Sequence, residues 1–257
     1  MPRAKNTWNV YWIKCSIFIN RQCAICYIYS DSIRLYLISK LSNIKEIFHY
    51  KFFSKKGKNF FNTAKKFTEK QLKIQINPQS KIYWDKNEIE KAKKKYNITS
   101  GAINYIANVS ASGPTKRWDI ENYIKLFGEL NKKNKSNFFI TGGKNDENLI
   151  KKIMDSSIGK ICLPLTQMDI SEIIPIIGAC NFSIGNDTGF SHIASGLGLQ
   201  CIILFMDSPP LSYGVYSKNI SVIVPQDENI ESCGHNTRGR DKISFEEVLK
   251  KSLTLVS

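Results

Sequence analysis

The sequence predicts a doubly wound α/β fold, in which helices cover both faces of a parallel sheet, for the C-terminal part of this 257-residue chain. From residue 101 onward, short apolar segments alternate with segments whose apolar residues recur at helical spacing. Glycine-containing polar turns follow several of the apolar segments. Hydrophobic residues make up 42% of the chain and charged residues 23%, which suffices for the core of one or two domains.

The elements of this part follow from the alternation. Strands are expected at residues 103–109, 138–141, 161–163, 180–184 and 201–205, and helices at residues 120–130, 147–154, 170–177 and 191–197. A helix between consecutive strands favours parallel pairing. Ligands of such sheets bind at the carboxyl ends of the strands, so the loops after residues 109, 141 and 184 form the candidate site.

The N-terminal part has a different composition. Apolar residues at helical spacing predict helices at residues 31–44 and 59–72, with a basic loop, KFFSKKGKNFF, at residues 51–61. The lysine-rich helical segment NEIEKAKKKYNI then gives way to alternating strands and turns near residue 100. We therefore expect two portions, residues 1–100 and residues 101–257.

The basic excess lies entirely in the first portion. The chain carries 37 Lys and Arg against 22 Asp and Glu, and residues 1–100 hold 21 basic and 6 acidic side chains. Such a surface suits nucleic acid, anionic lipid or a phosphorylated substrate, although a lysine-biased composition produces the same excess. Lys14 and Arg21 interrupt the apolar opening segment, which argues against a membrane-spanning helix and a signal peptide. We expect a cytoplasmic protein.

The seven cysteines are scattered and odd in number, which is typical of a reducing compartment. Cys23 and Cys26 form a C-x-x-C pair, but no second pair lies at zinc-site spacing, so we interpret it as accidental. Cys162, Cys180 and Cys201 lie in or beside apolar segments and are expected to be small buried hydrophobes.

The first loop, SASGPTKRW (residues 110–118), has an anion-binding composition. Small residues and a glycine allow close approach of the backbone to a ligand, and Lys116 and Arg117 supply positive charge. The spacing of a Walker A loop is absent. An ordinary turn, in which the lysine is solvated and Trp118 packs under the helix, is the alternative.

The second loop, TGGKNDE (residues 141–147), places Asp146 and Glu147 at the start of a helix. Acidic residues there usually complement the helix dipole. A carboxylate at a strand end can also hold the hydroxyls of a ribose or another sugar.

The third loop, in IGNDTGFSHIASGLG (residues 184–198), is the most informative segment. Thr188 and Gly189 can present N–H groups and a hydroxyl to a phosphate at a helix N-terminus, and His192 can add a donor. Asp187 would hold hydroxyls or orient a neighbour, whereas a purely structural histidine is the alternative. Asp-Thr-Gly also occurs in aspartic proteases, but a single copy that leads into a helix does not fit that class.

Several segments in order resemble glycosyltransferase family 9, the bacterial heptosyltransferases: NVSASGPTKRWDIENYIKLFGEL, FFITGGKNDE, LPLTQMDISEIIPIIGACNFSIGNDTGFSHIASGLGLQCIILF and the following SPP. The resemblance spans about residues 100–225. It implies a GT-B fold of two Rossmann-like domains, of which residues 101–257 would be the donor-binding domain and residues 1–100 an incomplete acceptor-side portion. It also implies an inverting transfer of heptose from ADP-heptose, without a metal or another cofactor, to the lipopolysaccharide inner core.

The resemblance further implies roles for individual residues. Lys116 would stabilise the charge that builds on the leaving ADP. The donor-binding residues would be Ser110, Ser112, Lys116, Asp146 or Glu147 for the ribose, Met168 for the nucleotide pocket, Asp187, Thr188, Gly189 and His192. The partners would be the nucleotide sugar, a lipopolysaccharide core or lipid A acceptor, and peripherally the inner membrane.

The chain departs from the family upstream, where CAICYIYSDSIRLYLISKLSNIKEIFHYKFF is similar to only the last part of the N-terminal domain. The family's Gly-Asp loop, whose aspartate is thought to be the general base, has no counterpart among the residues of this sequence. The general base is therefore unassigned, with Asp31 as one possible carboxylate. Two alternatives stay open: a nucleotide-sugar-binding relic without turnover, and a nucleic-acid binder that uses residues 1–100.

Overall fold

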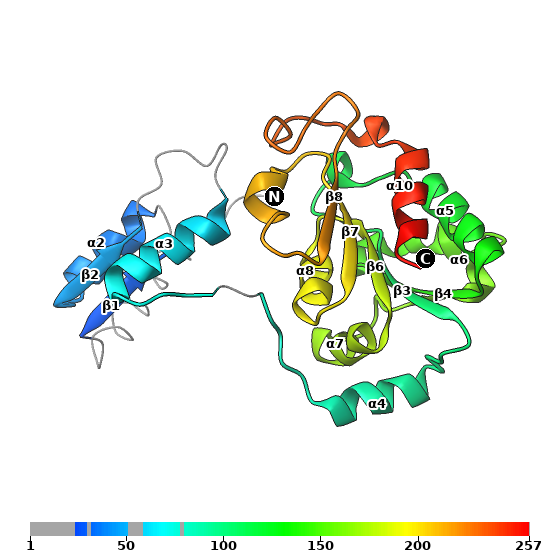
Figure 1. Ribbon diagram of the computed structural model, residues 1–257, viewed down its shortest axis with the longest axis horizontal. Helices are drawn as coiled ribbons and strands as arrows, with labels where there is room; N and C mark the ends of the chain where they lie inside the picture. The colour runs from blue at the N-terminus through cyan, green and yellow to red at the C-terminus, as the bar shows by residue number, and fades with distance from the viewer. Residues whose placement is uncertain (1–23, 30–31, 51–58, 78–79, 257) are drawn as a thin grey trace, which may run out of the picture. The chain divides into compact units, whose positions relative to one another are not determined.

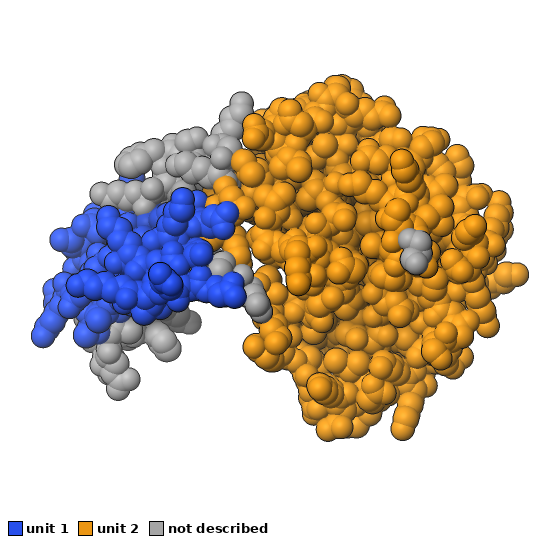
Figure 2. Space-filling view, viewed as in Figure 1, with its two compact units in different colours: residues 1–58, 62–77 blue, residues 59–61, 78–257 orange. Residues whose placement is uncertain are grey.

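A computed structural model describes residues 24–29, 32–50, 59–77 and 80–256. The chain forms two compact units, one of residues Met1–Lys58 and Asn62–Asn77, the other of Asn59–Phe61 and Pro78–Ser257 (Figure 2). The opening segment, Cys15, Cys23, Asp31 and most of the predicted basic loop lie outside the described residues.

The first unit contains a small parallel pair of strands with helices. Its elements are β1 (Ile25–Ile28), α2 (Ile33–Leu41), β2 (Glu46–His49) and α3 (Phe60–Leu72). Strands β1 and β2 pair in parallel, with Ile25 opposite Glu46. Helix α2 begins after Ser32, whose hydroxyl accepts the N–H of Leu35. The two helices predicted in this part are confirmed, with shorter bounds.

The second unit is built on a six-stranded parallel sheet in the order β5-β4-β3-β6-β7-β8 (Figure 1). Its strands are β3 (Ile103–Asn108), β4 (Ser136–Thr141), β5 (Cys162–Pro164), β6 (Phe182–Asn186), β7 (Gln200–Leu204) and β8 (Ile220–Ile223). Its helices are α4 (Lys86–Lys95), α5 (Ile120–Lys133), α6 (Glu147–Met154), α7 (Ile170–Ala179), α8 (Gly189–Gly196), α9 (Pro210–Tyr213) and α10 (Phe245–Thr254). The predicted doubly wound fold is confirmed.

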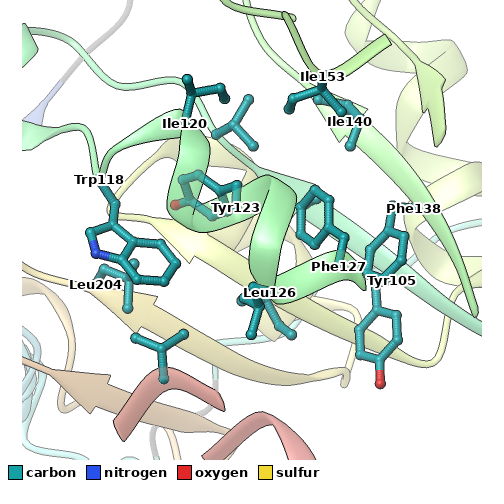
Figure 3. Packing of buried hydrophobic residues seen from close by; sticks show 14 of the residues in the cluster. Tyr105, Trp118, Ile120, Tyr123, Leu126, Phe127, Phe138, Ile140, Ile153 and Leu204 are labelled. Carbon is teal, nitrogen blue, oxygen red and sulfur yellow. The ribbon is translucent and has the colours of Figure 1, made fainter. Parts of the chain in front are cut away.

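Two apolar layers hold the sheet. Tyr105 and Ala107 of β3 pack toward α5, α6 and α10, whereas Ile106 packs on the opposite face with α7 and α8. This alternation reflects the two-residue period of a strand. On the first face, the rings of Phe127 and Phe138 stack with centroids 4.1 Å apart (Figure 3). Each layer buries apolar side chains from both strands and helices, which fixes the sheet from both sides.

The boundary between the units lies near residue 78, not near residue 100 as the composition predicted. Helix α4 packs on α7, and Ala92 and Ile98 are buried in the second unit. Ile89 also lies so close to Gly178 that a β-carbon there would be 2.9 Å from the isoleucine side chain. The change in composition follows the exposed lysines of α4, whereas the unit boundary follows its buried face.

Three predicted buried cysteines are confirmed. Cys162, Cys180 and Cys201 are 9%, 7% and 1% exposed. Burial raises the pKa of the Cys162 and Cys201 thiols to about 12, so they stay protonated at neutral pH. They fill space in the two apolar layers.

We expect Gly185→Ala to destabilise the second unit by about 3 kcal/mol, because the added methyl group overpacks the centre of the sheet. Gly185 has a φ of +153°, and a β-carbon there would lie 2.3 Å from the carbonyl oxygen of Asn108 on β3. Chemical denaturation measures the loss. Gly101→Ala is the matched control, since the nearest atom to its β-carbon is 3.8 Å away. Equal stability of the two variants would contradict the close approach of β3 and β6.

Candidate functional site

A cleft of about 580 Å³ opens in the second unit at the carboxyl ends of β3, β4 and β6. All three loops predicted from the sequence meet there, as the parallel sheet requires. The residues that line it are Ser110, Ala111, Ser112, Thr141, Gly142, Gly143, Asp146, Ile170, Asp187, Thr188, Gly189, Phe190, His192, Ile193 and Tyr213.

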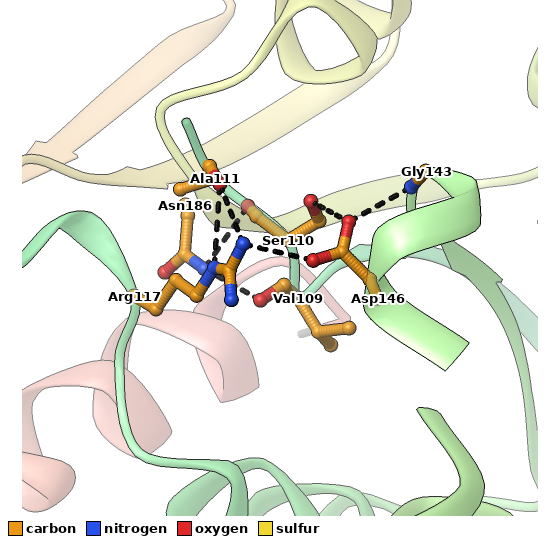
Figure 4. Close-up of polar contacts among 7 residues, drawn as sticks. All are labelled: Val109, Ser110, Ala111, Arg117, Gly143, Asp146 and Asn186. Carbon is orange, nitrogen blue, oxygen red and sulfur yellow. Dashed lines mark hydrogen bonds and ion pairs between the residues drawn. The ribbon is translucent and has the colours of Figure 1, made fainter. Parts of the chain in front are cut away.

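The Asp146 carboxylate joins the first loop to the second (Figure 4). The hydroxyl of Ser110 donates to Asp146 Oδ2 at 2.5 Å, and the N–H of Gly143 donates to the same oxygen at 2.9 Å. Arg117 Nη2 lies 2.9 Å from Asp146 Oδ1. Asp146 is 5% exposed, so this ion pair and its hydrogen bonds compensate a charge that burial would otherwise disfavour.

The two acidic candidates of the second loop differ in position. Asp146 lines the cleft, whereas Glu147 is exposed and accepts a hydrogen bond from Gln167 Nε2 at 2.5 Å. Of the two, Asp146 has the position that a contact to a ligand in the cleft requires.

Asn186, at the end of β6, fixes the first loop and was not singled out from the sequence. Its Nδ2 donates to the carbonyl oxygens of Val109 and Ser110 at 2.9 and 3.2 Å. Its Oδ1 accepts the N–H of Trp118 at 3.1 Å and the hydroxyl of Tyr123 at 2.8 Å. A polar residue at the end of an apolar strand is the signal that could have identified it. Trp118 packs beneath α5, as the ordinary-turn interpretation expected, but within a loop that lines the cleft.

Two side chains of the third loop and two that follow β7 form a continuous hydrogen-bonded series. Ser208 Oγ donates to Asp187 Oδ2 at 2.6 Å, and His192 Nε2 lies 3.0 Å from Asp187 Oδ1. His192 Nδ1 lies 2.7 Å from the hydroxyl of Tyr216. Of these four residues, sequence reasoning identified Asp187 and His192 only. Ser208 and Tyr216 follow β7, and no spacing rule links them to the third loop.

The chemistry of these groups assigns the protons. Burial raises the pKa of Tyr216 to about 12, so its hydroxyl is protonated at neutral pH. An ionised Asp187 can only accept, so the proton of a neutral His192 ring is on Nε2, and Nδ1 accepts from Tyr216. Both ring nitrogens are then occupied. His192 orients Asp187 here, and donation to a phosphate would require the ring to leave one of these partners.

Thr188 and Gly189 form the start of α8. The Thr188 hydroxyl is buried and has no hydrogen-bond partner among the residues that the structure describes, although the residue lines the cleft. A β-carbon at Gly189 would meet no atom within 4 Å. The first N–H groups of a helix lack partners within the helix and favour an anion. This end of the cleft therefore suits a phosphate.

Three other predicted residues lie beside the cleft rather than in its lining. Lys116 ends a short 3₁₀ turn, Pro114–Lys116, and its charge acts on the carboxylate of Asp207. Met168 packs against the second apolar layer, and Glu147 is exposed. Ser112, by contrast, is an exposed residue of the lining itself.

The described ranges contain neither a metal-binding cluster nor a membrane-spanning helix. No group of three or more His, Cys, Asp or Glu side chains there could hold a metal ion. No described helix is both long and apolar enough to cross a membrane.

A parallel α/β sheet with a helix N-terminus and carboxylates at its carboxyl edge is typical of nucleotide-binding domains. The sequence family "Glycosyltransferase family 9 (heptosyltransferase)" matches residues 57–243, more than half of the chain. The chain therefore belongs to glycosyltransferase family 9, and it is a glycosyltransferase. A search of curated proteins gave no significant match.

Solved structures of this class share the fold. A glycosyl transferase of family 9 from Veillonella parvula matches with a TM-score of 0.77 and 16% identity, over 99% of this chain and 80% of that one. The E. coli ADP-heptose lps heptosyltransferase II gives a TM-score of 0.76 and 16% identity, over 97% and 81%. E. coli heptosyltransferase WaaC with ADP gives 0.68 and 14%, over 99% and 82%. The GT-B-like fold predicted from the resemblance is confirmed.

We expect the Tyr216 hydroxyl to ionise near pH 12, two pH units above an ordinary tyrosine, because burial disfavours the phenolate. Its folded pKa lies above the unfolded value, so the stabilisation is complete below about pH 10 and is lost as the pH rises through 12. The difference in phenolate absorbance between the native chain and Tyr216→Phe measures this step. A difference that develops near pH 10 would contradict the buried position.

Proposed function

We propose that this glycosyltransferase transfers heptose from ADP-heptose to a lipopolysaccharide core acceptor, with inversion and without a metal. The observation that carries the proposal is the start of α8, where the unpartnered Thr188 hydroxyl and the open space at Gly189 lie in the same cleft as Asp187. A diphosphate at the helix N-terminus would place the attached sugar near that carboxylate. E. coli WaaC, which has the same fold, was solved with ADP and with ADP-2-deoxy-2-fluoro heptose.

The donor would be held by complementary groups. The Thr188 hydroxyl and the N–H groups at the start of α8 would bind the diphosphate, together with Ser112 of the first loop, which lines the same cleft. Asp187 keeps acceptor capacity on both oxygens and would hold sugar hydroxyls. Asp146, fixed by Ser110 and Arg117, would face the ribose.

Catalysis would rest on stabilising the leaving ADP. As the bond from the anomeric carbon to the diphosphate breaks, negative charge builds on the phosphate oxygens. The N-terminus of α8 and the nearby charge of Lys116 would stabilise that charge. An inverting transfer also needs a base for the proton of the acceptor hydroxyl. Both carboxylates that line the cleft, Asp146 and Asp187, already organise neighbouring loops, so we assign the base to neither.

The acceptor and the place of action follow from charge. The excess of basic side chains in residues 1–100 would attract the phosphorylated core of a lipopolysaccharide acceptor and the anionic face of the inner membrane. We propose a cytoplasmic enzyme that contacts this membrane peripherally.

We expect ADP to raise the melting temperature of the chain more than UDP or GDP, because the proposed donor is ADP-heptose. A ligand that binds only the native state stabilises that state. Lys116→Ala and Asp187→Ala should reduce the ADP shift, whereas Lys160→Ala, an exposed lysine at the opposite edge of the sheet, should leave it unchanged. A thermal melt with each nucleotide is the measurement.

The same melt separates the outcomes. A cooperative transition with no shift by ADP would remove the donor assignment. A shift by ADP without transfer of heptose to a purified core acceptor would identify a binding protein without turnover.

We expect Gly189→Ala to weaken ADP binding about tenfold, because one methyl group at the start of α8 would occupy the space that the phosphate needs. The melting temperature without ligand should stay level or rise slightly, since alanine favours a helix. Titration calorimetry with ADP, paired with a melt of the free chain, tests both. Unchanged affinity would place the phosphate elsewhere.

A further inference from the structure

Asp207 and Ser208 lie in the loop after β7, at the same edge of the sheet as the cleft, but neither lines it. Ser208 is 2% exposed. The N–H of Gly239 donates to the carbonyl of Met206, the residue before this dipeptide, at 2.8 Å. This short segment is therefore also held by a part of the chain outside the three loops.

Asp207 holds the first loop. The hydroxyl of Thr115 donates to Asp207 Oδ2 at 2.7 Å, and the N–H of Arg238 donates to Oδ1 at 3.0 Å. Thr115 precedes Lys116 in the 3₁₀ turn. Because β6 lies between β3 and β7 in the sheet, this contact reaches across the end of β6.

The surroundings of Asp207 keep its carboxylate ionised. Burial opposes its ionisation, but hydrogen bonds from Thr115 and from the N–H groups of Arg238 and Asn236, with the nearby charge of Lys116, lower its pKa below the ordinary value. Asp207 is thus an ionised acceptor beside the lysine of the first loop.

Ser208 holds the third loop. Its hydroxyl donates to Asp187 Oδ2 at 2.6 Å, while His192 contacts the other carboxylate oxygen. Ser208 thereby restricts rotation of the Asp187 carboxylate, and the same dipeptide that holds the first loop also holds the third.

We propose that Asp207 and Ser208 are positioning residues that fix the separation of the two donor-binding loops, one bearing Lys116 and the other Asp187, and so set the affinity for a nucleoside diphosphate. The inference rests on the proposed function, since it concerns the same cleft. Loops held in their binding geometry before the ligand arrives lose less conformational freedom on binding. Release of either loop would therefore lower the affinity for the ligand without removing any group that touches the ligand.

The test is titration calorimetry with ADP on the full chain and on Thr115→Val, Ser208→Ala and Asp207→Ala, each expected to bind about tenfold more weakly because a hydrogen bond to a charged group is lost. Thr115→Ser keeps the hydroxyl and should restore the native affinity. The control is Thr99→Val, an exposed threonine before β3 at the opposite edge of the sheet.

A double variant separates positioning from general damage. Thr115→Val combined with Asp207→Ala removes one shared contact and should bind no more weakly than Asp207→Ala alone, whereas Thr115→Val combined with Ser208→Ala removes two contacts and the losses should add. Thr115 is half-buried and valine has its shape, so Thr115→Val tests the inference even if a buried substitution impairs folding.

The failures are distinguishable. If the native chain binds ADP and Thr115→Val and Ser208→Ala bind it equally well, the positioning role is wrong and the proposed function stands. If Thr115→Ser binds as weakly as Thr115→Val, the hydroxyl is not the cause and the inference is again wrong. If the native chain does not bind ADP, both the proposed function and the inference are wrong.

Discussion

The cleft depends on the hydrogen bonds of the buried Asn186 side-chain amide. The first residues of the first loop are still buried where the chain leaves the sheet, and buried carbonyl and N–H groups without partners would destabilise the fold. Asn186 is 0% exposed and satisfies two carbonyls at the end of β3, the N–H of Trp118 and the hydroxyl of Tyr123. The two central strands, the first loop and the start of α5 are thereby joined at one point, and the cleft lies beside it.

Around this point the chain places acidic side chains next to a site suited to an anion, and each is compensated locally. Asp146 pairs with Arg117, Asp187 accepts from Ser208 and His192, and Asp207 accepts from Thr115. Each of these carboxylates therefore also holds a loop in place. The favourable field for an anion comes from the N-terminus of α8, where the Thr188 hydroxyl has no hydrogen-bond partner among the described residues.

The elements that could be predicted from the sequence are those with a strong period. Helix α6 has the predicted bounds, Glu147–Met154, because its apolar stripe is regular, whereas the short, partly exposed strand β8 was not assigned. Helix α10 was not assigned either, although its apolar residues recur at helical spacing. The rule for strand ends brought the three loops to one cleft. It could not supply Asn186, Ser208 or Tyr216, since their partners lie far along the chain and depend on the order of the strands. The sequence also could not show that both ring nitrogens of His192 are hydrogen-bonded, because one of their partners, Tyr216, lies 24 residues along the chain.

The sheet order has a consequence for association in concentrated solution. An open sheet offers two outer strands to which another chain could add. On one side, β5 has only three residues and ends in Pro164, which has no N–H to donate. On the other side, Lys251 of α10 donates to the carbonyl of Val222 on β8 at 3.2 Å, which occupies an outward-facing acceptor with a charged side chain. Growth of this sheet by intermolecular strand addition is thus disfavoured at both margins.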